Sequence, residues 1–245
     1  MLKYNKVYFL HIPKTGGRFL TKYILRPMDE IFKNNGIELI KMPENVMQHG
    51  GWHSTIDDKT YIITVFREPA EFFVSAVCHM MASKNGLIDE ENWHIVKDNN
   101  KTLHVEKEDV YETLSRWHYI NNFQAKNFAM HPIDKSMMHQ AIIDSENNVI
   151  LNKELVYERI SRTNLMIRHK DLKNMNYELL VNKIQHDLGI EISLDLSKIN
   201  KEHFKNHASE FLFNKLTEED KNNIVKSFDF DKEIYDNDSL FWVPS

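Results

Sequence analysis

The chain has 245 residues, of which 42% are hydrophobic and 27% are charged, and these proportions argue against a disordered or fibrous protein. The formal net charge of −5 excludes a basic field over the whole surface, so we expect no nucleic-acid partner. One cysteine, Cys78, allows no disulfide within the chain. The N-terminal residues lack the features of a signal peptide, and no stretch approaches the roughly 18 apolar residues of a membrane span. We therefore expect a cytoplasmic protein with no membrane span.

The first part of the chain predicts strands separated by a helix. Residues 6–12 are β-branched and aromatic and stop at Pro13, which is typical of a buried strand. After a Lys-Thr-Gly-Gly turn, apolar residues recur at helical spacing, which predicts a helix that ends near Pro27. Two further strands are expected at 37–42 and 60–66, and the second is apolar throughout, as in a covered parallel sheet.

The middle of the chain is less regular. Pro69 fits the first turn of a helix that extends to about Ser83. The polar, Asn-rich segment 83–107 predicts a loop or lid, and 110–130 has a helical pattern. Residues 131–150 give no clear prediction.

The last part of the chain again alternates between helix and strand. A helix is expected at 151–160, a strand at 164–168, and an amphipathic helix at 177–188 that closes at Gly189. Further on, Thr217 begins a capping box, with Asp220 in the place of the usual Glu.

Strands that alternate with helices indicate a parallel sheet with right-handed crossovers. No internal boundary is evident, so we predict a single domain over residues 1–245. Its expected fold class is α/β, with a central parallel sheet flanked by helices.

The residues with the clearest chemistry lie in the turn between the first strand and the first helix. Backbone N–H groups at a helix start are unpaired within the helix and lie at the positive end of its dipole, so they form a natural anion site. Gly16 and Gly17 let the backbone approach a phosphate closely, Lys14 adds a mobile positive charge, and Thr15 adds a hydroxyl. We therefore predict a P-loop-like phosphate-binding strand–loop–helix; the alternative is a plain turn with a solvated lysine.

This turn does not have the usual pattern of a nucleoside-triphosphate site. The motif GxxxxGK[ST] is absent, because here the lysine precedes the glycines. An ATP or GTP site is therefore only weakly indicated.

A second motif follows the strand at 60–66. Arg67 stands at the carboxyl end of this strand, and Ser75 follows on the predicted helix. Ligands of open α/β sheets bind outside the carboxyl ends of the strands, so Lys14 and Arg67 suit a ligand with two separated anionic groups. The alternative for Arg67 is a surface ion pair with Glu68 or Glu71.

Together the two motifs resemble the sulfotransferases that use 3′-phosphoadenosine-5′-phosphosulfate (PAPS), especially the carbohydrate O-sulfotransferases of the heparan-sulfate type. The resemblance rests on HIPKTGGRFL at 11–20 and VFREPAEFFVS at 65–75, with a weaker likeness in FDFDKEIYD at 228–236. It departs from the family at Phe72, where relatives usually have the second arginine of R-x-P-x-x-R-x-x-S.

The resemblance implies roles for individual residues. The 5′-phosphosulfate of PAPS would be surrounded by the loop residues and the start of the helix, namely Lys14, Thr15, Gly16, Gly17, Arg18 and Phe19. Arg67 and Ser75 would hold the 3′-phosphate, and Lys14 would also neutralise charge as the sulfuryl group leaves. The product of the cofactor would be adenosine 3′,5′-bisphosphate.

A histidine is the expected catalytic base, because its ordinary pKa lies near neutrality. The segment from Gln48 to His53 contains a His-x-x-Trp that resembles the base-bearing segment of some heparan-type enzymes, which favours His49 as the base and His53 as the second candidate. Glu44 or Asp57 could instead orient the imidazole or act as the base. We predict no metal site, because the two histidines have no accompanying cluster of ligands.

The sequence therefore predicts a sulfotransferase that moves a sulfuryl group from PAPS to a hydroxyl by in-line displacement. The acceptor is expected to be a carbohydrate or another small alcohol. Two alternatives remain: a nucleoside or small-molecule kinase with a variant phosphate loop, and a non-catalytic nucleotide-binding module. The sequence leaves the oligomeric state and the identity of the acceptor open.

Overall fold

The chain forms two compact units. The computed structural model describes residues 2–40, 52, 55–81, 87–89, 94–96, 102–104, 121–129, 151–199 and 207–244. Unit 1 comprises Met1–Phe66, Gln124–Phe204 and Asn237–Ser245, and unit 2 comprises Arg67–Phe123 and Lys205–Asp236. The single domain that the sequence predicts over 1–245 stays a prediction. Within the described ranges, no helix has both the length and the apolar character to cross a membrane.

A parallel four-stranded sheet forms the centre of unit 1. Its strands are β1 (Lys6–Leu10), β2 (Glu38–Ile40), β3 (Thr60–Phe66) and β7 (Leu165–Arg168), in the spatial order β2-β1-β3-β7. Leu10 pairs with Thr64, and Phe66 pairs with Arg168, so the carboxyl ends of neighbouring strands lie at the same edge. The predicted strands are confirmed, although β1 ends at Leu10 and not at residue 12.

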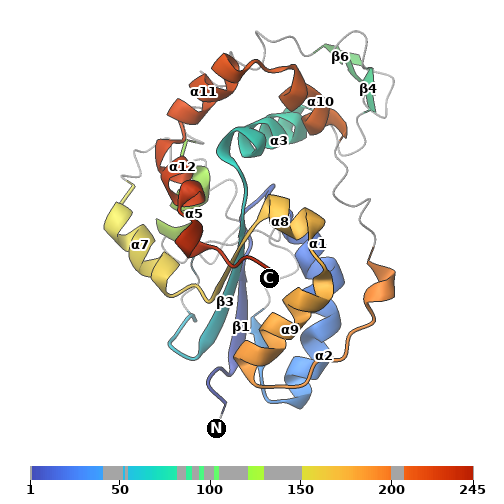
Figure 1. Cartoon of the computed structure of the whole chain (residues 1–245), viewed down its shortest axis with the longest axis vertical. Coiled ribbons are helices and arrows are strands. Elements are labelled where there is room, and N and C mark those ends of the chain that lie inside the picture. The colour runs from blue at the N-terminus through green and yellow to red at the C-terminus, as the bar shows by residue number, and fades with distance from the viewer. Residues whose placement is uncertain are drawn as a thin grey trace. The chain divides into compact units, whose positions relative to one another are not determined.

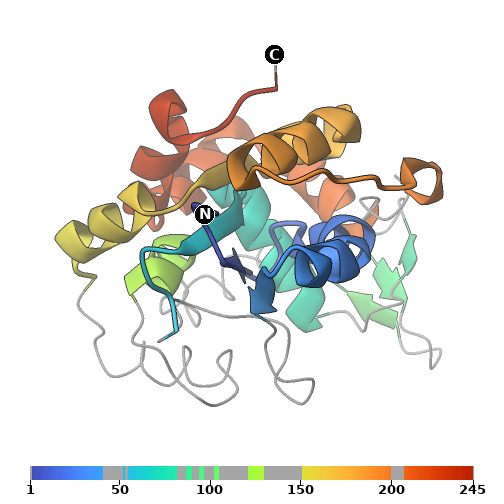
Figure 2. The same cartoon turned by 90° about the horizontal axis from the view of Figure 1, so that it is seen from below.

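Helices flank this sheet, which confirms the predicted α/β class. On one side of β1 and β3 lie α1 (Gly17–Leu20), α2 (Arg26–Asn34) and α9 (Tyr177–Leu188), and on the other lie α7 (Lys153–Ser161) and most of α5 (Phe123–Ala129) (Figures 1 and 2). Alternate strand residues face the first group of helices, as the period of two in a strand requires. The resulting core includes Val7, Phe9, Ile63, Val65, Phe19, Ile24, Phe32, Leu180 and Ile184.

The first helical run is longer than the sequence predicts. It is unbroken from Gly17 to Asn34 and contains a π-helical turn, η1 (Thr21–Leu25), between α1 and α2. The predicted end near Pro27 is therefore wrong. Pro27 lies in the first turn of α2, directly after the wider π turn, which shifts the backbone hydrogen-bond register. We attribute the tolerance of Pro27 to this shift, since a regular helix interior would need the N–H that proline lacks.

The predicted helix ends around β7 are confirmed. The side chain of Asn152 accepts a hydrogen bond from the Leu155 amide and caps α7. At the far end of α9, Gly189 adopts a φ of 67°, the left-handed conformation of a helix C-cap. Between β7 and α9 lies the short helix α8 (His169–Asn174).

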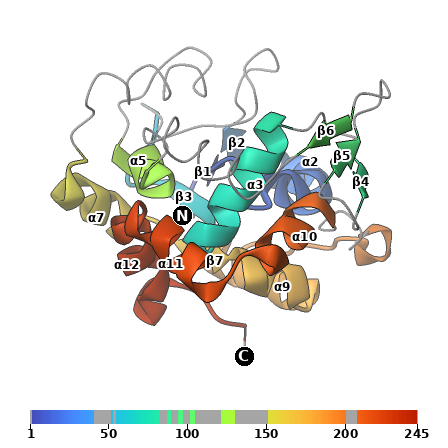
Figure 3. The same cartoon turned by 90° about the horizontal axis from the view of Figure 1, so that it is seen from above.

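Unit 2 has a helical core and a small antiparallel sheet. Its helices are α3 (Pro69–Met81), α10 (His207–Lys215), α11 (Glu218–Lys226) and α12 (Asp229–Asp236), with α3 beside α10 and α11 (Figure 3). The predicted capping box is confirmed, because Thr217 and Asp220 each accept from the other's backbone amide at the start of α11. The predicted helix from Pro69 is confirmed as α3.

In the middle of the chain, one prediction is wrong where the structure describes it and another is confirmed in part. The predicted loop at 83–107 contains the strands β4 (Leu87–Asp89), β5 (His94–Val96) and β6 (Thr102–His104), which are too short to show a period of two in the sequence. Of the helix predicted at 110–130, the part from Phe123 to Ala129 is confirmed as α5, which begins after Asn122, whose φ is 48°.

Asn122, which directly precedes α5, caps a helix of unit 2. Its Oδ1 accepts from the amides of Phe230 and Asp231 at 3.0 Å each. Its Nδ2 donates to Oδ1 of Asp229 at 2.9 Å. These contacts, made across more than a hundred residues of sequence, satisfy amides in the first turn of α12, and α5 starts only at Phe123.

A buried hydroxyl fastens α9 to the sheet of unit 1. Tyr61 of β3 donates from Oη to Oδ2 of Asp187 at 2.6 Å, and Lys183 donates from Nζ to Oδ1 at 2.7 Å. Burial alone raises the pKa of the Asp187 carboxyl, but the hydrogen bonds from Lys183, Tyr61 and His186 outweigh it, so the pKa is lowered overall.

Asp187→Asn is expected to destabilise the protein in a pH-dependent way. A carboxyl whose pKa is lower in the folded state stabilises fully above its unfolded pKa of about 4, and that contribution is lost as the pH falls through the folded pKa. Urea unfolding at pH 7 and pH 3 should show a loss of about 1–2 kcal/mol at pH 7 and a smaller loss at pH 3. An equal loss at both pH values would contradict the assignment.

Candidate functional site

The turn between β1 and α1 has an unusual backbone. Lys14 has a φ of 65° and Gly16 a φ of 95°, so two left-handed residues flank Thr15. A left-handed conformation is unfavourable for a lysine, and such residues cluster at ligand clamps and other functional sites. Turns of this kind can gather successive backbone N–H groups into a concave anion site.

The backbone amides from Thr15 to Arg18 are the donors of interest in this turn. The first helical hydrogen bonds run from the Phe19 amide to the Gly16 carbonyl at 3.0 Å and from the Leu20 amide to the same carbonyl at 3.4 Å. Residues 13–16 form a hydrogen-bonded turn, but in the described part of the chain no hydrogen bond of ordinary distance and angle is made by the backbone amides of Thr15, Gly16, Gly17 or Arg18. These donors lie at the positive end of a helical run that continues to Asn34, an arrangement that favours an anion.

The hydroxyl of Thr15 is turned inward. Its Oγ1 donates to the carbonyl of Ile12 at 2.8 Å, and the residue is fully buried. Because this hydrogen bond closes the turn, the threonine supports the shape of the loop and directs its hydroxyl proton into the protein.

The side chains around the turn divide into two cations that solvent reaches and buried side chains that support the turn. Lys14 is half-buried and Arg18 is exposed, so both can approach a ligand from solvent. Phe19 is fully buried in the core, where its ring packs 5.1 Å from the ring of Tyr23 and 5.1 Å from that of Tyr177. Of Phe19, only the backbone lies close to the turn.

The second motif lies in unit 2. Arg67 follows β3 directly, its side chain is 11% exposed, and its Nε lies 3.3 Å from Oε2 of Glu71. Burial lowers the pKa of the Arg67 guanidinium, while the charge of Glu71 opposes that shift. The Glu71 pair was the alternative role for Arg67, but the arginine is more buried than a surface pair.

Ser75 is also buried, with 2% of its surface exposed. The structure thus gathers Lys14, Thr15, Gly16, Gly17 and Arg18 in unit 1, and Arg67 and Ser75 in unit 2. One ligand that contacts both groups stays a prediction.

Phe72, the position at which the motif departs from the family, belongs to the core of unit 2. Its ring is 2% exposed, stacks on Phe123 with centroids 5.7 Å apart, and meets the edge of Phe228 at 6.3 Å. An arginine here would place a charge among aromatic rings. The residue therefore has a packing role that the sequence motif did not reveal.

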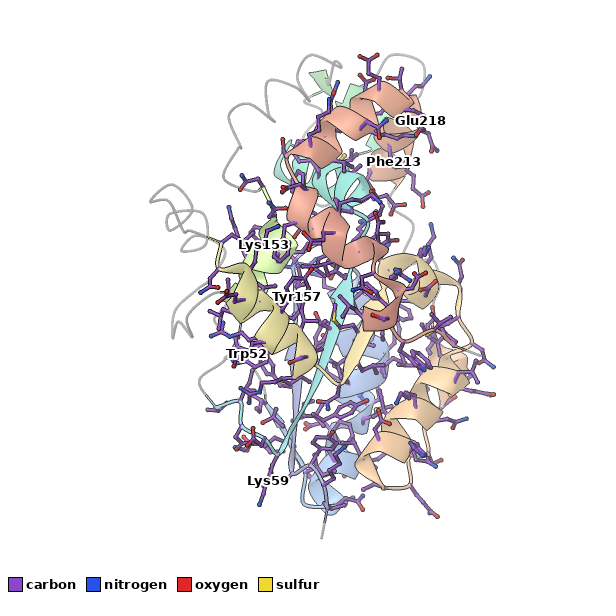
Figure 4. The ribbon with its side chains drawn as sticks, turned by 60° about the vertical axis from the view of Figure 1, so that its left-hand side comes forward. Trp52, Lys59, Lys153, Tyr157, Phe213 and Glu218 are labelled. Carbon is purple, nitrogen blue, oxygen red and sulfur yellow. The ribbon has the colours of Figure 1, made fainter. Side chains whose placement is uncertain are left out.

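The two candidate bases, His49 and His53, lie outside the described residues, as does Glu44. Trp52 is described and lies beside α7 (Figure 4), with the guanidinium groups of Arg159 and Arg162 5.2 and 5.3 Å from its ring centroid. Sequence reasoning missed this pairing, because no local pattern links residues a hundred positions apart.

Asp57, an alternative base, lies at the opposite edge of the sheet from the turn. It pairs with Lys6 at 2.6 Å, and this hydrogen bond holds the pKa of its carboxyl below the usual value. Lys6 begins β1 and the turn follows the end of β1, so the two places are separated by roughly 16 Å of strand. Asp57 is therefore not placed to act at the turn. Within the described ranges there is no group of three or more potential metal ligands.

Phe72→Arg is expected to destabilise unit 2 by about 3 kcal/mol or more, because the guanidinium would be buried without a built partner. Phe72→Leu, which keeps an apolar side chain, should cost less, about 1–2 kcal/mol. Chemical denaturation monitored by circular dichroism would compare the two variants. Equal stability of the arginine and leucine variants would show that position 72 does not face the core.

Comparison with known proteins adds no family to this picture: no protein-family model matches the chain, and no curated protein matches it either. The residues of the turn and their geometry are therefore the basis for assigning a function.

Proposed function

We propose that this protein is a PAPS-dependent sulfotransferase that acts on a hydroxyl-bearing acceptor. The observation that carries the proposal is the row of backbone amides from Thr15 to Arg18, which make no hydrogen bond of ordinary geometry in the described part of the chain and lie at the start of a long helical run. A phosphate oxygen is the acceptor that such a turn suits best. The resemblance of residues 11–20 and 65–75 to the sulfotransferases points to PAPS in particular.

The residues of the turn fit the 5′ end of PAPS. The amides of Thr15, Gly16, Gly17 and Arg18 would donate to the 5′-phosphate, and Lys14 would lie beside the oxygen that gains charge. When bound, PAPS supplies the sulfuryl group that is transferred. Donors fixed before the reaction stabilise developing charge without reorganising, so the turn would lower the barrier chiefly by electrostatics. Arg67 and Ser75 would hold the 3′-phosphate.

The remaining task for the chain is to remove the proton of the acceptor hydroxyl. His49 is the proposed base and His53 the second candidate, because imidazole accepts a proton near neutral pH. The acceptor would be a carbohydrate or another small alcohol. The net charge of −5 weakly disfavours a heavily sulfated polyanion.

Lys14→Ala should lower turnover with PAPS by roughly 10²–10³-fold, since it removes one preorganised charge from the reacting centre. Lys22→Ala is the matched control: this lysine is exposed, lies on the same helical run, and packs 4.8 Å from the ring of Tyr23. The assay would follow formation of adenosine 3′,5′-bisphosphate over a panel of hydroxyl acceptors. Turnover of the Lys14 variant equal to that of the control would refute the proposal.

His49→Ala should abolish turnover while leaving the affinity for adenosine 3′,5′-bisphosphate within about twofold of wild type, since a general base contributes typically 10²–10⁴ to the rate. His53→Ala provides the comparison, measured by the same turnover assay and by calorimetric titration. If the His53 variant alone is inactive, the base is His53 and the assignment of His49 is wrong.

A further inference from the structure

The imidazole of His11 lies directly against the backbone of Gly17. His11 is only 4% exposed and its ring stacks on Phe9, with centroids 5.1 Å apart and planes at 21°. A Cβ added at Gly17 would come closer than 3.0 Å to both Cδ2 and Nε2 of this ring, a separation that real Cβ atoms essentially never show.

Gly17 is needed for space and not for conformational freedom. Among the described glycines, those with positive φ are Gly16, Gly36 and Gly189, so Gly17 has a backbone that any residue can adopt. Gly16 and Gly17 therefore have different reasons to be glycine: the first supplies the left-handed conformation, and the second leaves room for the His11 ring.

The ring has little room to move away. Phe9 covers one face of it, and Phe9 is itself part of the buried core of unit 1. A side chain at residue 17 would therefore displace the backbone of the turn and, with it, the amides of Gly17 and Arg18. Closely packed interiors transmit such displacements and do not absorb them.

We infer that His11 is a positioning residue of the anion-binding turn, on which Gly17 rests and which sets the direction of the amides at the start of α1. The inference rests on the proposed function, because it assigns His11 to the site that would hold the 5′-phosphate. His11 has no part in proton transfer in this account: its ring acts by its shape.

A double-mutant cycle between the two residues tests this inference. Gly17→Ala, His11→Ala and the double variant would be titrated with adenosine 3′,5′-bisphosphate, and their thermal unfolding would be followed without ligand. We expect Gly17→Ala to weaken binding roughly tenfold or more. In the double variant the new methyl group would occupy the space of the missing ring, so binding should be stronger than the product of the two single losses predicts, again by about tenfold.

Gly36→Ala is the matched control for stability. Gly36 has a φ of 70°, and a Cβ there would meet nothing within 4 Å. This variant should lower the unfolding temperature through backbone strain without changing the affinity for the bisphosphate. A loss of affinity in Gly17→Ala that merely tracked a loss of stability would appear in this control as well, and would overturn the positioning role.

The outcomes separate the inference from the proposed function. If wild type binds the bisphosphate but Gly17→Ala binds equally well, or the two losses simply multiply, the role of His11 is wrong and the function stands. If wild type binds no bisphosphate, the proposed function fails. The unfolding temperatures of the four proteins in the cycle then test whether the His11 ring supports the backbone at Gly17. If the change in unfolding temperature of the double variant differs from the sum of the two single changes, His11 supports the turn. If it equals that sum, the inference is overturned.

Discussion

The constraint on which the site depends is the need of backbone amides for an acceptor. A buried or partly buried N–H without a partner costs free energy, so a folded chain rarely leaves several in succession. In the described part of unit 1, the amides from Thr15 to Arg18 in the turn after β1 make no hydrogen bond of ordinary geometry. The cost is accepted where an external anion completes the hydrogen bonds, which is the arrangement at phosphate-binding helix starts. The left-handed Lys14 and Gly16 produce this turn, and the Thr15 hydroxyl and the His11 ring hold it.

Phe72 shows how packing can remove a residue from a recognition motif. Two neighbouring phenylalanines of α3, Phe72 and Phe73, contact the ring of Phe228 in unit 2. Arg67 is meanwhile held by Glu71 one helical turn further along the chain. In the second motif, residue 72 packs in the interior of unit 2, and residue 67 is a largely buried cation.

Elements whose local pattern agrees with their tertiary role were predictable from the sequence. The strands β1, β3 and β7 are apolar runs of strand length, and α9 combines amphipathic spacing with a closing glycine. The failures have physical causes that lie outside the local window. A π turn lets the helix continue past Pro27, and three short strands lie where a loop was predicted at 83–107. In the site, the glycine pair was predictable, but the reason for Gly17 was not, because it depends on the ring of His11.

The most direct test of the central claim is a nuclear magnetic resonance titration of the ¹⁵N-labelled protein with adenosine 3′,5′-bisphosphate. Hydrogen bonds from the turn to a phosphate should make the amide resonances of Thr15, Gly16, Gly17 and Arg18 shift most strongly and saturate together, while ATP at the same concentration should shift them less. Largest shifts at another place in the chain, or a response of these amides to ATP alone, would contradict the account.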